Sequence, residues 1–258
     1  MLIDTHAHLY AEDYFEDFDQ VIQRAKQNNV ERVLLPNINA STIGLLKKIV
    51  HDNPDYLLPM MGLHPTSVKA DYQKQLNSIY KELNSDNNYI AIGEIGIDLY
   101  WDTTYIKEQT EVFETQLKWS IEKDLPVAIH SRNSYDEIVQ SLNRVGGEKL
   151  RGVFHSFSGD SDDLNELLKF ENFYIGINGI VTFKNSTLRE VLKMCPIEKI
   201  VLETDSPYLS PVPFRGKRNE PMFLEHINKV LSDIYVINPD QMAQTTKMNA
   251  QRLFRLNV

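Results

Sequence analysis

Histidines and carboxylates in this chain follow directly after short apolar runs, and these side chains are common ligands of transition metals. His6 and His8 are separated by one residue, so on a strand both imidazoles would point to the same face. Two imidazoles in that position could bind one ion, although an isolated His-X-His pattern is a weak signal. Other apolar runs are followed by further candidates, which are Glu94, His130, His155, Glu203 and Asp205. A metal centre is expected if the fold brings these positions together.

Eight short apolar runs provide the strands that would carry these side chains. Brief continuous runs of this kind are typical of strands buried on both faces of a parallel sheet. The runs are Leu2–Ile3, Arg32–Leu35, Tyr56–Met61, Tyr89–Ile92, Pro126–Ile129, Gly152–Phe154, Phe173–Ile177 and Lys199–Leu202. Because amphipathic segments alternate with them, the sequence predicts an α/β fold, a (β/α)8 TIM barrel that forms a single domain over residues 1–258. The alternative is an open, doubly wound sheet.

Apolar residues in the intervening segments recur at the three- and four-residue intervals of helices. Clear examples run from Phe18 to Ala25 and from Val112 to Ile121, and a last helix is expected over Asp240–Leu256. Further helices are expected to begin near Ser41, Tyr72, Ser134, Asp160, Ser186 and Glu220. Ser41 and Asp160 have side chains suited to N-caps. In a parallel barrel the strands end at one edge, where active sites form, so the candidate ligands would meet there. Burying them without a partner would be costly, which favours a bound metal.

Seven motifs in order make the chain resemble the TatD family of metal-dependent deoxyribonucleases, within the amidohydrolase-like hydrolases. They are Asp4–His8, Gly62–Pro65, Gly93–Asp98, His130–Arg132, His155–Gly159, Leu202–Pro207 and Arg215–Pro221. The resemblance covers nearly the whole chain and implies a TIM barrel with two divalent metal ions. It implies that His6, His8 and Asp205 hold one ion, that His130 and His155 hold the other, and that Glu94 bridges both. Imidazoles and carboxylates accept Zn²⁺, Mn²⁺, Co²⁺ or Mg²⁺, so the sequence does not identify the metal.

This site would hydrolyse a phosphodiester with a water activated by the two metals. Asp205 would bind a metal and could accept the proton of the water. Glu203 would orient the water or a ligand, or would be a carboxylate satisfied by a basic neighbour. By resemblance, His64, Arg132 and a basic loop are expected to contact the substrate phosphate; the loop residues are Arg215, Lys217 and Arg218. Tyr100 and Trp101 either stack on a base or pack within their loop.

The composition limits the partners of the chain. Lys and Arg number 27 and Asp and Glu 36, and the formal net charge of −9 argues against a broad DNA-binding face. No apolar run is long enough to span a membrane, and Met1–His6 lacks the features of a signal peptide, so we expect a cytoplasmic protein. Cys195 is the single cysteine and is expected to be a buried packing residue.

Three classes of function remain to be compared. The leading hypothesis is a deoxyribonuclease that acts on single strands or ends, with DNA as its partner and no obligate protein partner. The alternative is an amidohydrolase-type hydrolase of a small-molecule ester, lactone, amide or phosphoester, because the same barrel and ligands would serve it. A non-catalytic binding module is disfavoured by the complete ligand set. A serine nucleophile at Ser156 or Ser158 is disfavoured because neither lies in a Gly-X-Ser-X-Gly motif.

Overall fold

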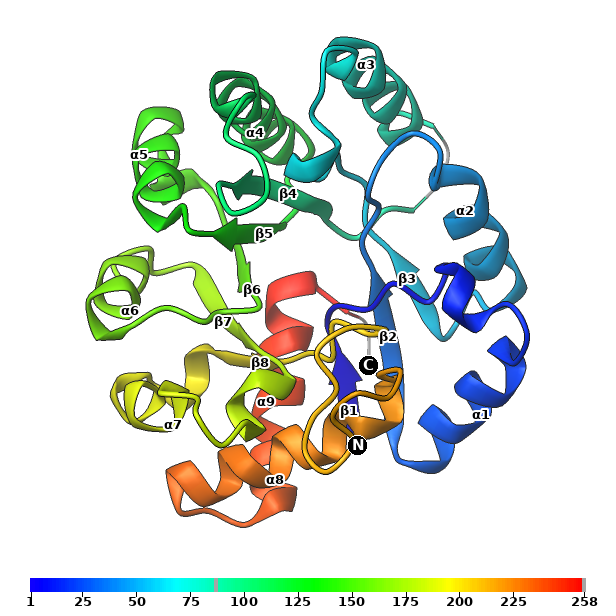
Figure 1. Cartoon of the computed structure of the whole chain (residues 1–258), viewed down its shortest axis with the longest axis vertical. Coiled ribbons are helices and arrows are strands. Elements are labelled where there is room, and N and C mark those ends of the chain that lie inside the picture. Colours follow the sequence, from blue (N-terminus) through cyan, green and yellow to red (C-terminus); the bar gives the residue numbers. More distant parts are fainter. Residues whose placement is uncertain (86–87, 257–258) are drawn as a thin grey trace.

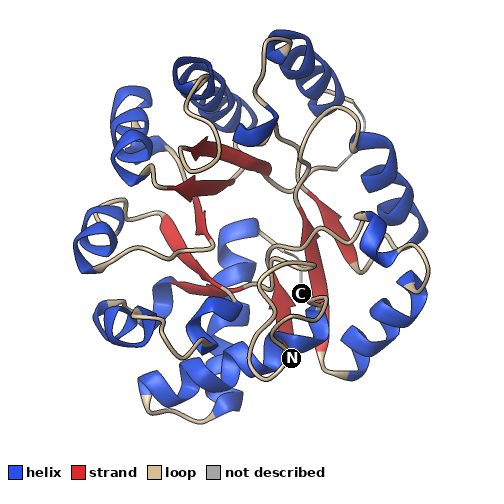
Figure 2. Ribbon diagram, in the orientation of Figure 1, coloured by secondary structure: helices blue, strands red, loops and turns tan. Residues whose placement is uncertain are grey.

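Strands and helices alternate along the chain in the computed structural model, which describes residues 1–85 and 88–256 (Figure 1). The strands are β1 (Leu2–Asp4), β2 (Val30–Leu35), β3 (Leu57–Pro59), β4 (Ile92–Asp98), β5 (Val127–Arg132), β6 (Gly152–His155), β7 (Phe173–Ile177) and β8 (Ile200–Leu202). The helices are α1 (Phe18–Gln27), α2 (Ile43–Asp52), α3 (Tyr72–Leu83), α4 (Ile106–Lys123), α5 (Tyr135–Val145), α6 (Ser161–Leu167), α7 (Leu188–Val191), α8 (Leu224–Tyr235) and α9 (Pro239–Phe254). Figure 2 shows the strands surrounding the centre and most helices lying outside them.

The strands form two parallel sheets whose order follows the chain, β1-β2-β3 and β4-β5-β6-β7-β8. An isolated parallel bridge between Met60 and Ala91 links β3 to the start of β4, and another between Ala7 and Ser206 links the segments after β1 and β8. A doubly wound sheet would instead reverse its strand order at a switch point. The predicted α/β class is therefore confirmed, and the arrangement is TIM-barrel-like, with two sheets that meet at two bridged seams.

Two apolar layers hold the strands in place. The larger layer lies between the strands and the outer helices, and in α4 it takes up Val112, Phe113 and Leu117. The smaller layer gathers side chains from the inner faces of the strands, among them Ile3, Leu34, Met60, Ala128, Val153 and Val201. Ala250, Leu253 and Phe254 of α9 pack against this inner layer. The last helix therefore completes the inner apolar layer, and Cys195 is buried as expected.

Two predicted N-caps have different outcomes. Asp160 caps α6, because its side chain accepts the backbone N–H groups of Asp162 and Asp163 in a capping box. The prediction for Ser41 was wrong, since α2 begins at Ile43 and its N-cap is Thr42. The Ser41 hydroxyl instead donates to Oδ1 of Asn39, 2.6 Å away, so the side chain serves the preceding turn.

The fourth strand is displaced from the apolar run that predicts it. The run ends at Ile92, but β4 begins there and continues to Asp98 with every residue buried. Glu94 thus lies inside the strand rather than after it. At Gly96 the backbone has φ of +147°, and a Cβ atom would lie 1.9 Å from the carbonyl oxygen of His130. This position needs glycine, and its absence of a side chain lets β4 and β5 run close together beside Glu94 and His130.

Within the described part of the chain, no helix is both long enough and apolar enough to cross a membrane.

Candidate metal centre

The six predicted ligands come together at the carboxyl ends of the strands. His6 and His8 follow β1, Asp205 follows β8, and the other three lie in β4, β5 and β6. A cavity of about 640 Å³ opens over them and is lined by His8, Glu94, His130, His155 and Asp205 among others. His6 is fully buried, with its Nε2 atom 3.2 Å from Oε2 of Glu94. Residues separated by up to 199 positions in the sequence therefore form one cluster.

The first group of donor atoms joins the segments after β1 and β8. Nε2 of His6 lies 3.3 Å from Nε2 of His8 and 3.9 Å from Oδ1 of Asp205. Nε2 of His8 is 3.5 Å from the same carboxylate oxygen. Ligand atoms held about 2.1 Å from a single ion lie roughly 3.0–3.4 Å apart. The two shorter separations are close to this range and the His6–Asp205 separation exceeds it, so the three side chains surround a space in which one ion could be held after a small adjustment of Asp205.

Glu94 places its two oxygens toward different groups of histidines. Oε2 lies 3.2 Å from Nε2 of His6 and 3.6 Å from Nε2 of His8. Oε1 lies 3.0 Å from Nδ1 of His130 and 3.8 Å from Nε2 of His155. Each oxygen faces its own set of imidazoles, which is the arrangement that a carboxylate would need if it bridged two ions.

The outward-facing nitrogens of three histidines are held by neighbouring groups. Tyr10 donates its hydroxyl hydrogen to the carbonyl oxygen of Pro36, so Nδ1 of His8, 3.0 Å from that hydroxyl, must be the donor. The lone pair of His8 therefore sits on Nε2 and points into the cluster. Such outer partners fix the tautomer of a metal-binding histidine.

His130 and His155 have carboxylate partners in the same role. Nε2 of His130 lies 2.9 Å from Oδ2 of Asp98. Nδ1 of His155 lies 3.0 Å from Oε1 of Glu203, which also accepts the backbone N–H of Ser156. In each case the opposite ring nitrogen faces Glu94, as expected for a carboxylate–histidine–metal arrangement.

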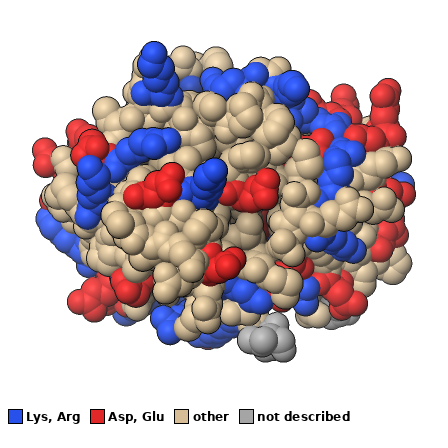
Figure 3. Space-filling view, turned by 90° about the horizontal axis from the view of Figure 1, so that it is seen from below, with Lys and Arg blue, Asp and Glu red and all other residues tan. Residues whose placement is uncertain are grey.

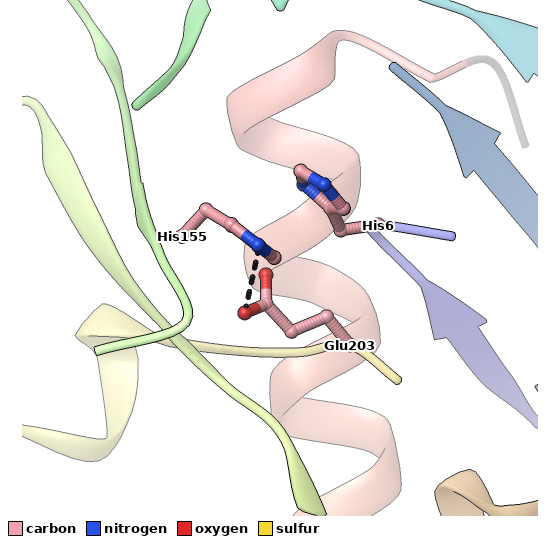
Figure 4. Close-up of side chains that lie close together, drawn as sticks. All are labelled: His6, His155 and Glu203. Atoms are coloured by element: carbon pink, nitrogen blue, oxygen red, sulfur yellow. Dashed lines mark ion pairs between the residues drawn. The ribbon is translucent and has the colours of Figure 1, made fainter. Parts of the chain in front are cut away.

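Figure 4 shows the ion pair between Glu203 and His155, with the ring of His6 beside them. The imidazoles of His6 and His155 are stacked with their centroids 3.3 Å apart. Glu203 is fully buried and is not among the residues that line the cavity. The basic neighbour of Glu203 is His155, which is itself a candidate metal ligand. A carboxylate that orients a ligand and a carboxylate that is satisfied by a basic side chain are therefore the same contact here.

Charge in the cluster is balanced among carboxylates and imidazoles. Burial disfavours the ionised form of Glu94, but the surrounding histidines outweigh it and hold its pKa well below the usual value. Burial also opposes protonation of His130, yet hydrogen bonds to Asp98 and Glu94 raise its pKa to about 9. Imidazole and carboxylate donors that converge on shared space in this way suit divalent transition metals, which would replace those protons.

His64 differs from the other histidines of the cavity. Its Nδ1 atom accepts the backbone N–H of Thr66 and lies 2.7 Å from the Thr66 hydroxyl. The ring proton must therefore be on Nε2, which lies 3.4 Å from Oε1 of Glu94. Burial lowers the pKa of His64 and keeps the ring neutral. Although His64 lies close enough to Glu94 and His130 to form a metal-binding group with them, its geometry presents a hydrogen-bond donor.

The four predicted phosphate-binding cations have different positions. Arg132 is exposed at the rim of the cavity. Arg215 and Lys217 lie over the rings of Phe183 and Phe214, and Arg218 forms ion pairs with Asp17 and Glu220. None of the three loop cations lines the cavity. The structure thus brings only Arg132 to the candidate metal centre.

Sequence reasoning did not single out two residues that orient ligands, Asp98 and Tyr10. Asp98 is four residues after Glu94 in β4, and this even spacing would have placed both side chains on one face of the strand. For Tyr10 the sequence offers no comparable signal, because its contact with His8 depends on the turn after β1.

Comparison with known proteins identifies the family. The model of a family described as TatD related DNase matches residues 3–255. This chain belongs to the TatD family. The resemblance inferred from the seven motifs is therefore confirmed, and the chain is a member of a family of metal-dependent hydrolases.

Individual TatD relatives match along their whole lengths. An uncharacterized metal-dependent hydrolase of Bacillus subtilis, YabD, is 38% identical over 258 residues, which cover 100% of both chains. A 3′-5′ ssDNA/RNA exonuclease of Erwinia tasmaniensis is 29% identical, with 99% of this chain and 100% of that protein covered. The crystal structure of the TatD homologue YJJV from Escherichia coli superposes with a TM-score of 0.92 at 29% identity, covering 99% and 98% of the two chains.

Proposed function

We propose that this protein is a metal-dependent deoxyribonuclease that hydrolyses phosphodiester bonds in single strands or at strand ends. The observation that carries the proposal is the orientation of the Glu94 carboxylate, whose two oxygens face two separate groups of imidazoles. The exonuclease of Erwinia tasmaniensis, whose name specifies single-stranded DNA and RNA, supports this substrate class. We further propose that the chain acts as a single domain, in the cytoplasm and without an obligate protein partner.

In this proposal two divalent ions occupy the cluster. His6, His8 and Asp205 would hold one ion, His130 and His155 would hold the other, and Glu94 would bind both. The separations among these donor atoms support the assignment. Zn²⁺, Mn²⁺, Co²⁺ and Mg²⁺ remain the candidate metals. Bound there, the ions would supply an activated water and would offset charge on the reacting phosphate.

The remaining roles belong to side chains of the cavity. Asp205 is 13% exposed at its side chain and lines the cavity, so it is positioned to accept a proton from the attacking water. His64 would donate its Nε2–H to a phosphate oxygen, and Arg132 would attract the substrate at the rim. Glu203 would act as a positioning residue that holds His155 rather than as a proton carrier. A role for Arg215, Lys217 and Arg218 would require contacts outside the cavity.

The proposal is tested by cleavage of end-labelled single- and double-stranded oligonucleotides with each of the four metals and with EDTA. We expect metal-dependent shortening of single strands that EDTA abolishes. Asp205→Asn should retain the circular dichroism spectrum and lose turnover. If the metal-loaded protein hydrolyses a lactone, amide or simple phosphoester but no oligonucleotide, the small-molecule alternative is correct. Wild-type rates in Asp205→Asn would contradict the assignment of the site.

A further inference from the structure

The loop after β4 exposes two neighbouring aromatic side chains at the rim of the cavity. Tyr100 is 53% exposed and Trp101 is 69% exposed. Trp101 lines the main cavity and also a smaller adjoining one of about 250 Å³, where it is joined by Thr66 and Lys69. Large aromatic side chains usually gain stability from burial, so a pair exposed beside a candidate active site indicates a binding surface.

Several hydrogen bonds hold this loop in a defined position. Oδ1 of Asp98 accepts the backbone N–H groups of Tyr100 and Trp101 at 3.0 and 3.3 Å. Asp102 accepts the backbone N–H of Thr104 and forms an ion pair with Lys69. The other oxygen of Asp98 contacts His130, so one carboxylate connects the aromatic pair to a candidate metal ligand. The pair is therefore fixed relative to the site.

Arg132 completes the surface from the neighbouring strand. Its guanidinium lies 3.8 Å from the ring centroid of Tyr100 and 5.2 Å from that of Trp101. The two rings are perpendicular, with centroids 4.9 Å apart. Among the described residues, no carboxylate forms an ion pair with Arg132, in contrast to Arg218. Flat apolar faces and an unpaired cation thus occur together within reach of the cavity.

We propose that Tyr100, Trp101 and Arg132 form a nucleobase-binding platform, on which Trp101 stacks against an unpaired base next to the phosphate at the metal centre. Every base has a π-face, so the platform would accept any sequence, and the cation would meet the adjoining phosphate. Stacking of this kind requires a base that is free of its complement. The inference rests on the proposed nuclease function and would give that function its preference for single strands.

The direct test uses the two tryptophans of the chain, because Trp119 is 9% exposed and Trp101 is open to solvent. Binding is measured by tryptophan fluorescence without turnover, in an Asp205→Asn background, with a thymidine 10-mer as the probe. We expect the 10-mer to quench the emission of a Trp119→Phe variant, in which Trp101 is the only tryptophan. The emission of Trp101→Phe, which retains only Trp119, should change little. Equal quenching in both variants would overturn the platform.

A second measurement pairs substitutions in the protein with abasic sites in the strand. Trp101→Ala should weaken binding of the 10-mer about tenfold, whereas Trp101→Phe keeps a stacking face and should stay within about twofold. Single nucleotides of the 10-mer are then replaced, one at a time, by a tetrahydrofuran abasic residue. At one position the loss of affinity should match that caused by Trp101→Ala, and combining that abasic strand with the Trp101→Ala protein should cause no further loss. Additive losses at every position, or equal losses in the Ala and Phe variants, would contradict stacking.

Cleavage assays separate this inference from the function on which it depends. If wild-type protein cleaves single strands and Trp101→Ala cleaves them with an unchanged KM, the platform is wrong and the nuclease function stands. If wild-type protein cleaves no oligonucleotide with any of the four metals, the nuclease function itself fails. Under the proposal, Trp101→Ala raises KM about tenfold and leaves kcat close to the wild-type value.

Discussion

At the scale of single residues, the role of each cavity histidine follows from the nitrogen that it leaves available. His8 is held through Nδ1 by Tyr10, and its Nε2 lone pair faces Asp205. His64 is held in the opposite tautomer, because Nδ1 accepts the N–H of Thr66 and the proton is left on Nε2. A ring nitrogen that carries a proton has no free lone pair, so Nε2 of His64 cannot bind a cation in this tautomer. The same residue type can therefore act as a metal ligand or as a substrate contact, depending on one backbone N–H group.

Metal content should distinguish these two roles. We expect His64→Ala to retain the metal of the wild-type protein and to lose about tenfold to a hundredfold in turnover, because a hydrogen bond to a charged phosphate is missing. His130→Ala should lose metal, and Glu94→Ala should lose occupancy at both ions. Elemental analysis of the dialysed variants measures the amount of metal bound per chain. Depletion in His64→Ala as severe as in His130→Ala would make His64 a ligand.

At the scale of elements, the sequence predicts strands well where a strand is uniformly apolar and less well where it carries the site. The run Phe173–Ile177 coincides with β7. In β4 and β5 the strands continue through Glu94, Asp98, His130 and Arg132, beyond the ends of the apolar runs. The polar side chains of Glu94, Asp98 and His130 are tolerated because partners from other strands satisfy them, and such distant partners cannot be deduced from local sequence. The ligands could be predicted from motifs, but the tautomers and outer partners required the fold.

The loop after β8 and the rim strand β5 should respond differently to loss of a cation. Arg218 makes ion pairs with Asp17 and Glu220, so it ties this loop to the segment before α1. We expect Arg218→Ala to lower the free energy of unfolding by about 1–2 kcal/mol and to leave the salt dependence of DNA binding unchanged. Arg132→Ala should leave stability unchanged and flatten the salt dependence. If Arg218→Ala instead flattened the salt dependence and Arg132→Ala instead lowered the stability, the basic loop would be a substrate contact.

The same network predicts a loss of stability in acid. Hydrogen bonds from Arg218 and Arg24 hold the pKa of Asp17 well below its ordinary value of 3.8. A depressed pKa stabilises the folded state above the ordinary value, and this contribution is lost as the pH falls toward the folded pKa. The melting temperature of wild-type protein should therefore fall more steeply below about pH 4 than that of Asp17→Asn. Parallel melting curves for the two proteins between pH 5 and pH 2 would contradict this contribution.

At the scale of the whole molecule, the net charge of −9 is compatible with the proposed nucleic-acid substrate because the proposed contact is small. Figure 3 shows one face on which acidic and basic side chains are interspersed, without a broad basic area among the described residues. The cations that the proposal uses are confined to the cavity and its rim. A long duplex would meet repulsion over the rest of the surface, whereas one strand end would meet only the cavity.

This confinement predicts a short footprint on nucleic acid. Contacts with about two phosphates should give a slope of log K against log salt of about −1 to −2 for a single strand. Because the contact ends at the rim, affinity should stop rising beyond a few nucleotides, so a 6-mer and a 30-mer, which have the same number of ends, should bind alike. Fluorescence titrations of Asp205→Asn at several salt concentrations measure both quantities. A slope steeper than about −4, or affinity that grows steadily with length, would require an extended phosphate-binding surface outside the cavity.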